Sequence, residues 1–401
     1  MNILSISSLF PNTNMPNHGV FVYNRLNAMA RDANITVINP LPWSPFHYCF
    51  KRYKGLRGIP AQREQGRLSI HHPRFFSIPG ALKEVEQHTF ARCVSRLATE
   101  LNPKGTSFDC IDVHWPYPDL PVALALAKKW GIPCNITLRG MEAFYLDEKD
   151  KRPAIIKQAL SQVDGVISLS EEMAETAHAL ADTKSKTTLI RNGADTQKFQ
   201  HQPMSEARAS LGLPPEGLVF LSVGALIERK GYQNVISALS QLSIAGKLPS
   251  HWRYYIIGSA GLEGNCEQTL RNQIKTLALE EHVILQGSVN NPLLPIWYNA
   301  ADVFCLSSFG EGSPNVLTEA LSCGCPAIAT RVGAVPDIMS SVPDLGVMVD
   351  VGQTEDWCEA IPALLSKTTS RALRAQALAP YDWAWCGDKA LSALKGLCLR
   401  G

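Results

Sequence analysis

Residues 301–339 read ADVFCLSSFGEGSPNVLTEALSCGCPAIATRVGAVPDIM, and this stretch predicts the fold of the chain. A short apolar run is followed by a glycine-containing loop, a helical pattern that resumes at Pro314, and a second apolar run. Continuous apolar strands that alternate with helices are typical of a parallel sheet covered on both faces. We therefore expect doubly wound, Rossmann-like α/β architecture.

The same alternation recurs along the chain in two groups. The expected strands are NILSISS, NITVINP, LSIHHP, CIDVHW, PCNITLRG, DGVISLS and TTLIRNG in the first half, and LVFLSVGAL, RYYIIGS, HVILQGS, DVFCLSS, PAIAT and LGVMVDV in the second. A segment with two prolines and a glycine lies between the groups and favours a boundary near Leu213. We expect one domain over residues 1–212, a second over 213–378, and an amphipathic terminal helix within 379–401.

Composition restricts the class of protein. The chain has 401 residues, 45% of them hydrophobic and 18% charged, with a formal net charge of +2. This composition predicts a soluble, multi-domain globular protein and argues against a general nucleic-acid binder. The eleven cysteines contain no C-x-x-C pair, which is typical of a reducing cytoplasm. No signal peptide and no apolar run long enough to span a membrane is recognised, so a cytoplasmic location is expected.

Two carboxylates flank the start of the helix near Pro314. Glu311 lies in the glycine loop and Glu319 lies inside the following helix, with Ser313 expected as N-cap and Pro314 as first helical residue. Free N–H groups and the positive dipole end at such a helix start suit an anionic pyrophosphate. The two acids would then hold hydroxyl groups at two ends of one ligand. The alternative, which we weigh equally, is that neither acid binds a ligand: Glu311 would interact with the helix dipole and Glu319 would be an exposed helical residue.

Arg229 and Lys230 follow the strand LVFLSVG directly. A cation pair at a strand end can neutralise the charge that grows on a departing diphosphate; a solvated basic loop is the alternative. The sequence contains no Asp-x-Asp and no His/Cys cluster at metal spacing. From these residues we expect a nucleotide-diphosphate site that uses neither a metal nor a cofactor.

Five blocks together resemble glycosyltransferase family 4, whose members are retaining enzymes of the GT-B fold. The block EGSPNVLTEAL looks like the Glu-x7-Glu signature of that family. The other four are VGALIERKGYQNVISAL, LIRNGADTQKF, LQGSVNNPLLPIWYNAADVFCLSS and SSLFPNTNMPNHGVFVYNRLNAMA. The resemblance implies two Rossmann-like domains facing across a cleft, the first for the acceptor and the second for the nucleotide sugar. It also implies that the terminal helix crosses back to the first domain.

The resemblance implies roles for matching positions. Glu311 is implied to sit beside the reacting sugar carbon, Glu319 to bind the ribose hydroxyls, and Arg229 and Lys230 to bind the diphosphate. The donor is further implied to meet Gly19 and the backbone amides around Gly312, Ser313, Asn315, Val316 and Leu317. Asn192 matches an asparagine that is implied to support the cleft.

Arg139 departs from the family pattern, because many members carry a histidine at this position. An arginine cannot act as a base there, but it can bind a donor phosphate or an anionic acceptor. Ala225 also stands where an arginine is common. These departures leave the two glutamates and the two cations in place.

Acceptor recognition is expected in the first half of the chain. His114, Trp115 and Tyr117 follow the strand CIDV, and Glu142 completes the expected acceptor-binding set; a packed aromatic core is the alternative. Residues 51–75 contain seven basic side chains and one acid, a local charge of +6. Interleaved Tyr53, Leu56 and Ile59 suggest a surface that docks on anionic membrane, with a solvated loop as the alternative.

The resemblance implies transfer of a hexose-type sugar to a hydroxyl of a glycan or lipid-linked acceptor, with retention at the anomeric carbon. The N-terminal loop looks similar to enzymes of bacterial exopolysaccharide and cell-wall polysaccharide assembly. A GT-B nucleotide-sugar epimerase and a non-catalytic nucleotide-sugar binding protein are the two alternatives. Expected partners are the nucleotide sugar, the acceptor and an anionic membrane surface on the inner face of the cell membrane, with no nucleic acid.

Overall fold

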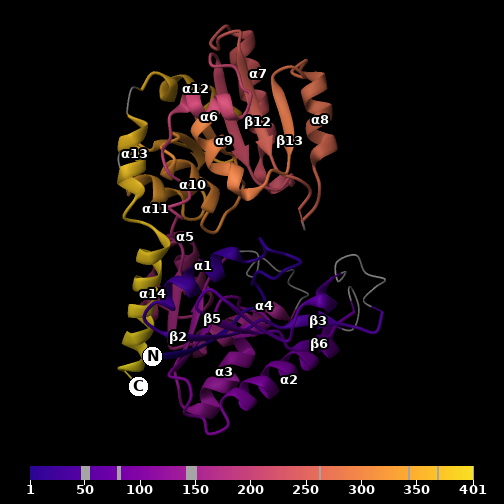
Figure 1. The fold of residues 1–401 in the computed structure, drawn as a ribbon, viewed down its shortest axis with the longest axis vertical. Coiled ribbons are helices and arrows are strands. Elements are labelled where there is room, and N and C mark those ends of the chain that lie inside the picture. The colour runs from indigo at the N-terminus through magenta and orange to yellow at the C-terminus, as the bar shows by residue number, and fades with distance from the viewer. Residues whose placement is uncertain are drawn as a thin grey trace. The chain divides into compact units, whose positions relative to one another are not determined.

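The computed structural model describes residues 1–46, 55–78, 83–140, 151–261, 263–341, 344–367 and 370–400. The chain forms two compact units, one made of Met1–Asn192 and Trp383–Gly401 and the other of Gly193–Asp382 (Figure 1). Glu142 lies outside the described residues, as does the start of the basic segment at 51–54.

The first unit is built on an eight-stranded sheet with strand order β10-β9-β8-β7-β1-β2-β5-β4. Its pairings are parallel except for β4, which runs antiparallel to β5. The strands are β1 (Asn2–Ile6), β2 (Asn34–Ile38), β4 (Gln62–Gln65), β5 (Leu68–His71), β7 (Cys110–Val113), β8 (Cys134–Thr137), β9 (Gly165–Ser168) and β10 (Thr187–Leu189). A small separate sheet pairs β3 (Leu41–Trp43) with β6 (Arg74–Phe76).

Helices cover both faces of this sheet. Along β1, Ile3 packs into one core cluster while Leu4 packs into the other, as the period-two alternation of a strand buried on both faces requires. The cluster around Leu4 includes α2 (Lys83–Leu101), α3 (Asp119–Trp130), α4 (Arg152–Gln162) and α5 (Glu171–Leu180). The cluster around Ile3 includes α1 (Val20–Met29) and α14 (Trp383–Cys398), which lie side by side (Figure 1).

Helix α14 completes the core of the first unit although it comes from the end of the chain. It buries Cys386, Ala390, Leu391 and Leu394 against α1 and the sheet. Arg25 of α1 is fully buried, and its Nε donates to Cys386 Sγ at 3.3 Å while its Nη2 donates to the Ile190 carbonyl at 3.0 Å. The returning helix therefore supplies apolar area and a hydrogen-bond partner to the first unit.

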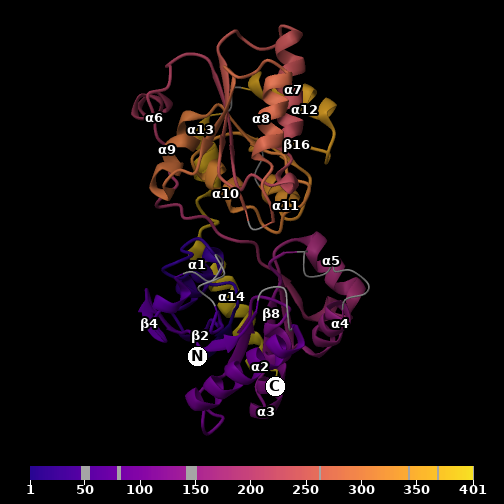
Figure 2. The ribbon, with the colours of Figure 1, turned by 90° about the vertical axis from the view of Figure 1, so that its right-hand side faces the viewer.

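The second unit holds a six-stranded, fully parallel sheet with strand order β13-β12-β11-β14-β15-β16. Its strands are β11 (Leu218–Val223), β12 (Trp252–Ile257), β13 (Val283–Gly287), β14 (Val303–Leu306), β15 (Ala327–Thr330) and β16 (Gly346–Val349). One face carries α7 (Tyr232–Ile244), α8 (Glu267–Thr276) and α12 (Thr354–Leu365); the other carries α9 (Leu294–Ala300), α10 (Asn315–Ser322) and α11 (Val335–Ser340). Figure 2 shows α7 and α8 separated by this sheet from α9 and α10.

The boundary between the units precedes the one expected at Leu213. Helix α6 (Met204–Ser210) packs on α9, and Arg208 is buried, pairs with Asp302 Oδ2 at 2.7 Å and donates to the Ala300 carbonyl at 3.1 Å. The proline-rich segment is therefore a loop inside the second unit. At the other end, α13 (Arg371–Leu378) is followed by Tyr381, whose carbonyl accepts from Ala194 N at 3.1 Å, which keeps residues up to Asp382 with the second unit.

Every run predicted as a strand contains one, whereas β3, β4 and β6 were missed. Strand β4 reads QREQ and is part-exposed along its length, so it lacks the apolar run on which the prediction depended. Within the described part of the chain, none of the helices combines the length and apolar character needed to cross a bilayer.

Candidate active site

Two neighbouring strand ends bring the predicted residues of the second unit together. Strands β11 and β14 are adjacent, so the loops that follow them meet at the carboxyl edge of the sheet. The loop after β11 contains a 3-10 turn, Glu228–Lys230. Phe309 N donates to the Arg229 carbonyl at 2.7 Å, and Ser307 Oγ donates to the Lys230 carbonyl at 2.8 Å. These bonds fix the loop after β11, which carries Arg229 and Lys230 (the cation loop), against the loop after β14, which carries Glu311 (the carboxylate loop).

Glu311 is the centre of this cluster. Its Oε1 accepts from Lys230 Nζ at 2.6 Å and from Ser308 Oγ at 2.6 Å, and its Oε2 lies 3.7 Å from Arg229 Nη1. The Glu311 side chain is only 10% exposed. The structure thus brings together the first glutamate and the two cations that the sequence singles out.

Arg229 has a further partner that sequence reasoning missed. Its Nε and Nη2 each donate to a carboxylate oxygen of Glu263 at 2.9 Å, and its Nη1 donates to the Gly310 carbonyl at 2.6 Å. The hydrogen bonds from Arg229 lower the pKa of Glu263. Glu263 follows β12, which is adjacent to β11, so an acid soon after that strand was the available signal. The four side chains Arg229, Lys230, Glu263 and Glu311 balance in charge.

Helix α10 begins one residue later than expected. Pro314 has an extended conformation (φ −74°, ψ 101°) and occupies the cap position, so the helix starts at Asn315 and no side-chain cap bond is found there. The expected cap Ser313 has a buried Oγ with no hydrogen-bond partner among the described residues. The Leu317 amide donates to the Pro314 carbonyl at 3.1 Å, so this amide, which was expected to meet the donor, is already used. Val316 is half-buried against the core.

The loop that follows β15 packs against the carboxylate loop and is hydrogen-bonded to it. Ala334 N donates to the Gly312 carbonyl at 2.9 Å. Gly333 has φ +52°, and a Cβ at this position would overlap the carbonyl oxygens of Glu311 and Gly312. Glycine is needed here for both its backbone conformation and its lack of a side chain. The position of Glu311 therefore depends on a third strand end.

Glu319 lies apart from the ion-paired cluster, in a different environment. Its Oε2 accepts from the Tyr298 hydroxyl at 3.0 Å. Burial raises the pKa of Glu319 to about 7, and the Tyr298 hydrogen bond and the charge of Lys198 lower it only in part. Within the described residues, no contact joins Glu319 to Glu311 or the cations. One carboxylate of the motif is paired with cations, whereas the other has a pKa of about 7.

Gly19 and Arg139 are the predicted donor-binding residues of the first unit. Gly19 precedes α1 with φ +67°, and a Cβ there would lie 2.6 Å from the Leu9 carbonyl carbon. Arg139 follows β8 and is 6% exposed; its Nη1 donates to Asn192 Oδ1 at 2.8 Å. Asn192 thus orients Arg139, in keeping with a supporting role.

His114 is an interior residue, which differs from the expected contact with an acceptor. It has no exposed surface; its Nδ1 lies 3.0 Å from Arg139 Nη2 and its Nε2 lies 3.2 Å from Asp112 Oδ2. Burial lowers the pKa of His114 to about 4, so the ring is neutral at pH 7. Trp115 and Tyr117 are half-buried and pack against the core of the first unit. For these aromatic residues, the alternative of a packed cluster describes the structure better.

The described part of the basic segment is also used internally. Arg63 donates to the Pro11 carbonyl at 2.7 Å and to His72 Nε2 at 3.0 Å, and Arg74 donates to the Ile59 carbonyl at 2.8 Å. Leu56 and Ile59 are buried rather than presented on the surface. The described residues contain no group of three or more His, Cys, Asp or Glu side chains placed to hold a metal ion.

Comparison with solved structures defines the class of fold. The chain aligns over 99% of its length with Anabaena Alr3699/HepE in complex with UDP, covering 100% of that chain, with a TM-score of 0.73 and 19% sequence identity. It aligns over 100% of its length with a sucrose-phosphate synthase from Thermosynechococcus elongatus, covering 96% of that chain, with a TM-score of 0.71 and 19% identity. The fold is that of the GT-B proteins.

Sequence comparison gives the family. The family model described as Glycosyltransferase Family 4 matches residues 18–198, and the one described as Glycosyl transferases group 1 matches residues 203–377. The chain is 26% identical over 344 residues to TuaC of Bacillus subtilis, named as a glycosyltransferase of teichuronic acid biosynthesis, with 84% of this chain and 83% of TuaC covered. The chain belongs to the family 4 glycosyltransferases and is an enzyme of that class.

Proposed function

We propose that this enzyme transfers a sugar from a nucleotide-diphosphate sugar to a hydroxyl of a glycan or lipid-linked acceptor, with retention at the anomeric carbon. One observation carries the proposal. Arg229, Lys230 and Glu311 converge at the carboxyl edge of the second sheet, within hydrogen-bonding or ion-pairing distance of one another. Glu311 lies in the loop that leads into α10, and the start of that helix has no side-chain cap.

The diphosphate is the group that this arrangement suits. Arg229 and Lys230 can neutralise the charge that develops as the bond between sugar and phosphate breaks. Asn315 and Val316, with Gly312 and Ser313 before them, would present backbone N–H groups at the start of α10. We propose that this stabilisation needs no metal ion. Activity that persists in excess EDTA would support this part of the proposal, and loss that Mg²⁺ restores would contradict it.

The two motif carboxylates are assigned different tasks. Glu311, paired with Lys230, would lie beside the reacting sugar, and Glu319 would accept hydrogen bonds from the ribose hydroxyls. In the transfer step the acceptor oxygen bonds to the anomeric carbon while the bond from that carbon to the phosphate oxygen breaks. The acceptor proton passes to the departing phosphate oxygen. This front-side course leaves the anomeric configuration unchanged.

The acceptor is proposed from the relatives. TuaC is named for teichuronic acid biosynthesis, which supports a role in bacterial polysaccharide assembly. The second relative, a D-inositol 3-phosphate glycosyltransferase of Pseudarthrobacter chlorophenolicus, is 27% identical over 296 residues, 71% of this chain and 69% of its own length. Its name supports a hydroxyl acceptor that carries a phosphate, which Arg139 would suit. The HepE complex makes UDP-sugars the first donors to test.

A cytoplasmic site of action at the inner face of the membrane is part of the same proposal. The exposed Arg57 and Arg67, together with the excess of basic residues in 51–75, support attraction to anionic lipid. Flotation with vesicles of phosphatidylglycerol and of phosphatidylcholine tests this. Recovery with anionic vesicles alone is expected, and equal recovery with both would contradict it.

A transfer assay tests the proposed reaction. The enzyme is incubated with radiolabelled UDP-, GDP-, ADP- and dTDP-sugars, with and without a membrane-lipid extract from a polysaccharide-producing bacterium. The proposal expects label in a glycan or lipid product only when acceptor is present, and an anomeric configuration equal to that of the donor. Conversion of the nucleotide sugar without acceptor would instead identify an epimerase. A product of inverted configuration would contradict the proposed course.

A further inference from the structure

The last turn of α14 meets the beginning of β7 through two cysteines. The Cys398 thiol donates to the Asp109 carbonyl at 3.5 Å, and Asp109 immediately precedes Cys110. Cys398 also packs against the core cluster that contains Cys110. Two cysteines that are 288 positions apart in the sequence therefore lie in the same part of the core of the first unit.

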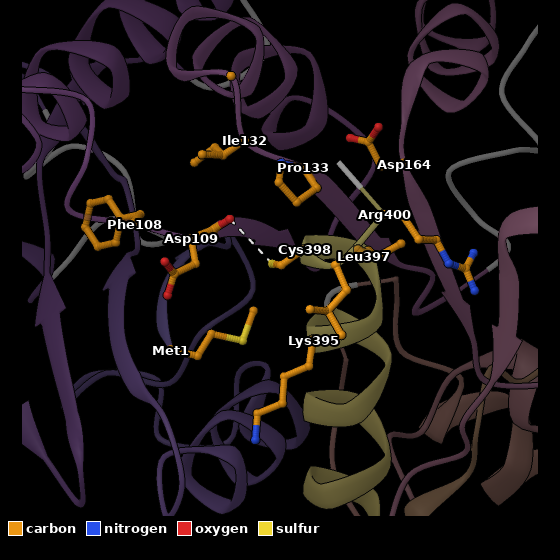
Figure 3. A pocket seen from close by; sticks show the side chains of 12 residues that line it. Met1, Phe108, Asp109, Ile132, Pro133, Asp164, Lys395, Leu397, Cys398 and Arg400 are labelled. Atoms are coloured by element: carbon orange, nitrogen blue, oxygen red, sulfur yellow. Dashed lines mark hydrogen bonds between the residues drawn. The ribbon is translucent and has the colours of Figure 1, made fainter.

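A pocket of about 830 Å³ gives solvent access to one of these thiols. Figure 3 shows Cys398 at its wall beside Asp109, with Lys395 and Leu397 from the same helix. Cys398 is partly exposed, whereas Cys110 is completely buried. A small solute that enters the pocket would meet Cys398 and would not reach Cys110.

The two thiols also differ in acidity. The hydrogen bond from Cys110 lowers the pKa of Cys398 to about 7, while the same bond, together with burial, raises the pKa of Cys110 far above its usual range. The other partly exposed cysteines of the described chain, Cys93 and Cys358, have pKa values raised by burial. Cys398 is therefore the thiol with the largest thiolate fraction in this group, and thiolates are the reactive form.

We propose that Cys398 and Cys110 form a redox-active dithiol, in which Cys398 reacts with peroxide and Cys110 then closes an internal disulfide that links α14 to β7. The Cys398 thiolate attacks one peroxide oxygen; a sulfur–oxygen bond forms, the oxygen–oxygen bond breaks, and the departing hydroxide takes up a proton to become water. The Cys110 sulfur then attacks the Cys398 sulfur. A sulfur–sulfur bond forms, the sulfur–oxygen bond breaks, and the hydroxide leaves with the Cys110 proton as a second water.

Both sulfurs are oxidised in this sequence by one peroxide, whose two oxygens are reduced, so the electrons balance. An external dithiol reverses the reaction by thiol–disulfide exchange. The bridge would enclose the whole second unit in a covalent loop and would tie α14 to the sheet that it covers. Since α14 supplies part of the core of the first unit, the oxidised enzyme should unfold at a higher temperature than the reduced one.

The test uses the full-length enzyme. Protein is treated with hydrogen peroxide, blocked with N-ethylmaleimide, digested without reduction and examined by mass spectrometry. We expect a peptide pair joined through Cys110 and Cys398 that dithiothreitol separates. At pH 7, alkylation of reduced protein should be roughly fivefold faster at Cys398 than at Cys358, because the larger thiolate fraction outweighs the lower nucleophilicity of the more acidic thiol.

Variants make the outcome decisive. C358S should form the bridge as wild type does, and C398S should abolish both the bridge and the rise in Tm. C398S alters a partly exposed position, so its folding is less at risk than that of C110S. A bridge from Cys110 to the neighbouring Cys134 would overturn the proposal. Accumulation of Cys398 as sulfinic or sulfonic acid without any bridge would overturn it as well.

Discussion

At the residue level, two acids of the protein itself, Glu263 and Glu311, neutralise the cation pair Arg229 and Lys230. Lys230 and Ser308 both hold Glu311, which is nearly buried, whereas Glu263 contacts Arg229 from a loop with its side chain half exposed. A diphosphate that approaches Arg229 must compete with one of these acids. Glu263 is the acid with more freedom to leave.

Replacing Glu263 by glutamine should therefore tighten the binding of a nucleoside diphosphate. The change removes a negative charge that competes for Arg229, and exposed ion pairs contribute up to about 1 kcal/mol, which corresponds to roughly a threefold to fivefold lower Kd. Isothermal titration at low ionic strength measures the effect. E267Q is the matched control, because Glu267 forms an exposed ion pair with Arg271 on α8. Binding by E263Q that equals or falls below that of E267Q would contradict the competition.

The pKa of Glu319 predicts a pH dependence of donor binding. A carboxylate accepts hydrogen bonds from ribose hydroxyls best when it is ionised, and a pKa of about 7 means that this form becomes dominant only above neutral pH. Affinity should rise by up to about tenfold between pH 6 and pH 8, following the ionised fraction. E319Q serves as reference because the phosphate groups titrate equally in both proteins. Identical pH profiles for wild type and E319Q would exclude the assigned role.

Some of the site follows from sequence, and some depends on information that a sequence pattern does not contain. The meeting of Glu311 with Arg229 and Lys230 follows from strand ends that a doubly wound sheet places side by side. Glu263 and Tyr298 were missed because they reach the site from other segments, a loop and α9. The burial of His114 was missed because the sequence pattern of a histidine after a strand does not show whether its ring faces a ligand or a neighbouring arginine.

At the level of elements, three loops determine where Glu311 lies. The loop after β14 carries it, the loop after β11 binds it, and the loop after β15 fixes its backbone through Gly333 and Ala334. The late start of α10 has a local cause, since Pro314 takes an extended ψ and leaves the helix to begin at Asn315. Sequence predicted this helix and its loop correctly, but a boundary beside a proline is decided by one backbone angle.

Gly333→Ala should disturb the carboxylate loop. The added Cβ would meet the carbonyl oxygens of Glu311 and Gly312, and the positive φ adds strain of about 1–3 kcal/mol. We expect at least a tenfold loss in kcat/KM. Gly246→Ala is the control, because Gly246 has a similar φ of +65° but no atom within 4 Å of the added Cβ. Urea unfolding of both variants measures the backbone strain, and donor titration of both measures the displacement of the carboxylate loop. A G333A enzyme as active as G246A would show that the loop does not depend on this contact.

At the level of the whole molecule, the chain enters the second unit at Gly193 and returns to the first at Trp383. The two doubly wound sheets were predictable, because continuous apolar strands repeat with regular helical intervals. The boundary was not, because the prolines near Leu213 mark a loop after α6, and the packing of α6 on α9 is a tertiary contact that local composition does not reveal.

Removal of α14 should unfold the first unit. A chain that ends at Asp382 loses the buried side chains of Cys386, Ala390, Leu391 and Leu394 and leaves Arg25 without one of its partners. Each large aliphatic side chain lost from a core costs about 2–5 kcal/mol, so the two leucines alone account for about 4–10 kcal/mol, which is comparable to the stability of an ordinary domain. Aggregation or loss of the near-UV circular dichroism signal is expected. A chain that ends at Cys398, which lacks only the highly exposed Leu399 and the residues after it, is the control. A soluble, fully active protein ending at Asp382 would contradict the assignment of α14.

The measurement that tests the account most directly is calorimetric titration of UDP, GDP, ADP and dTDP into wild type, K230A and K275A. K275A is the control, because Lys275 is an exposed residue in the last turn of α8 and makes no contact with Arg229, Lys230 or Glu311 among the described contacts. We predict that at least one nucleoside diphosphate binds wild type and K275A alike, and that K230A weakens its binding by about tenfold or more, as expected for the loss of a charged hydrogen bond to phosphate. Equal binding to K230A and wild type would contradict the assignment of the diphosphate to Lys230 and its neighbours.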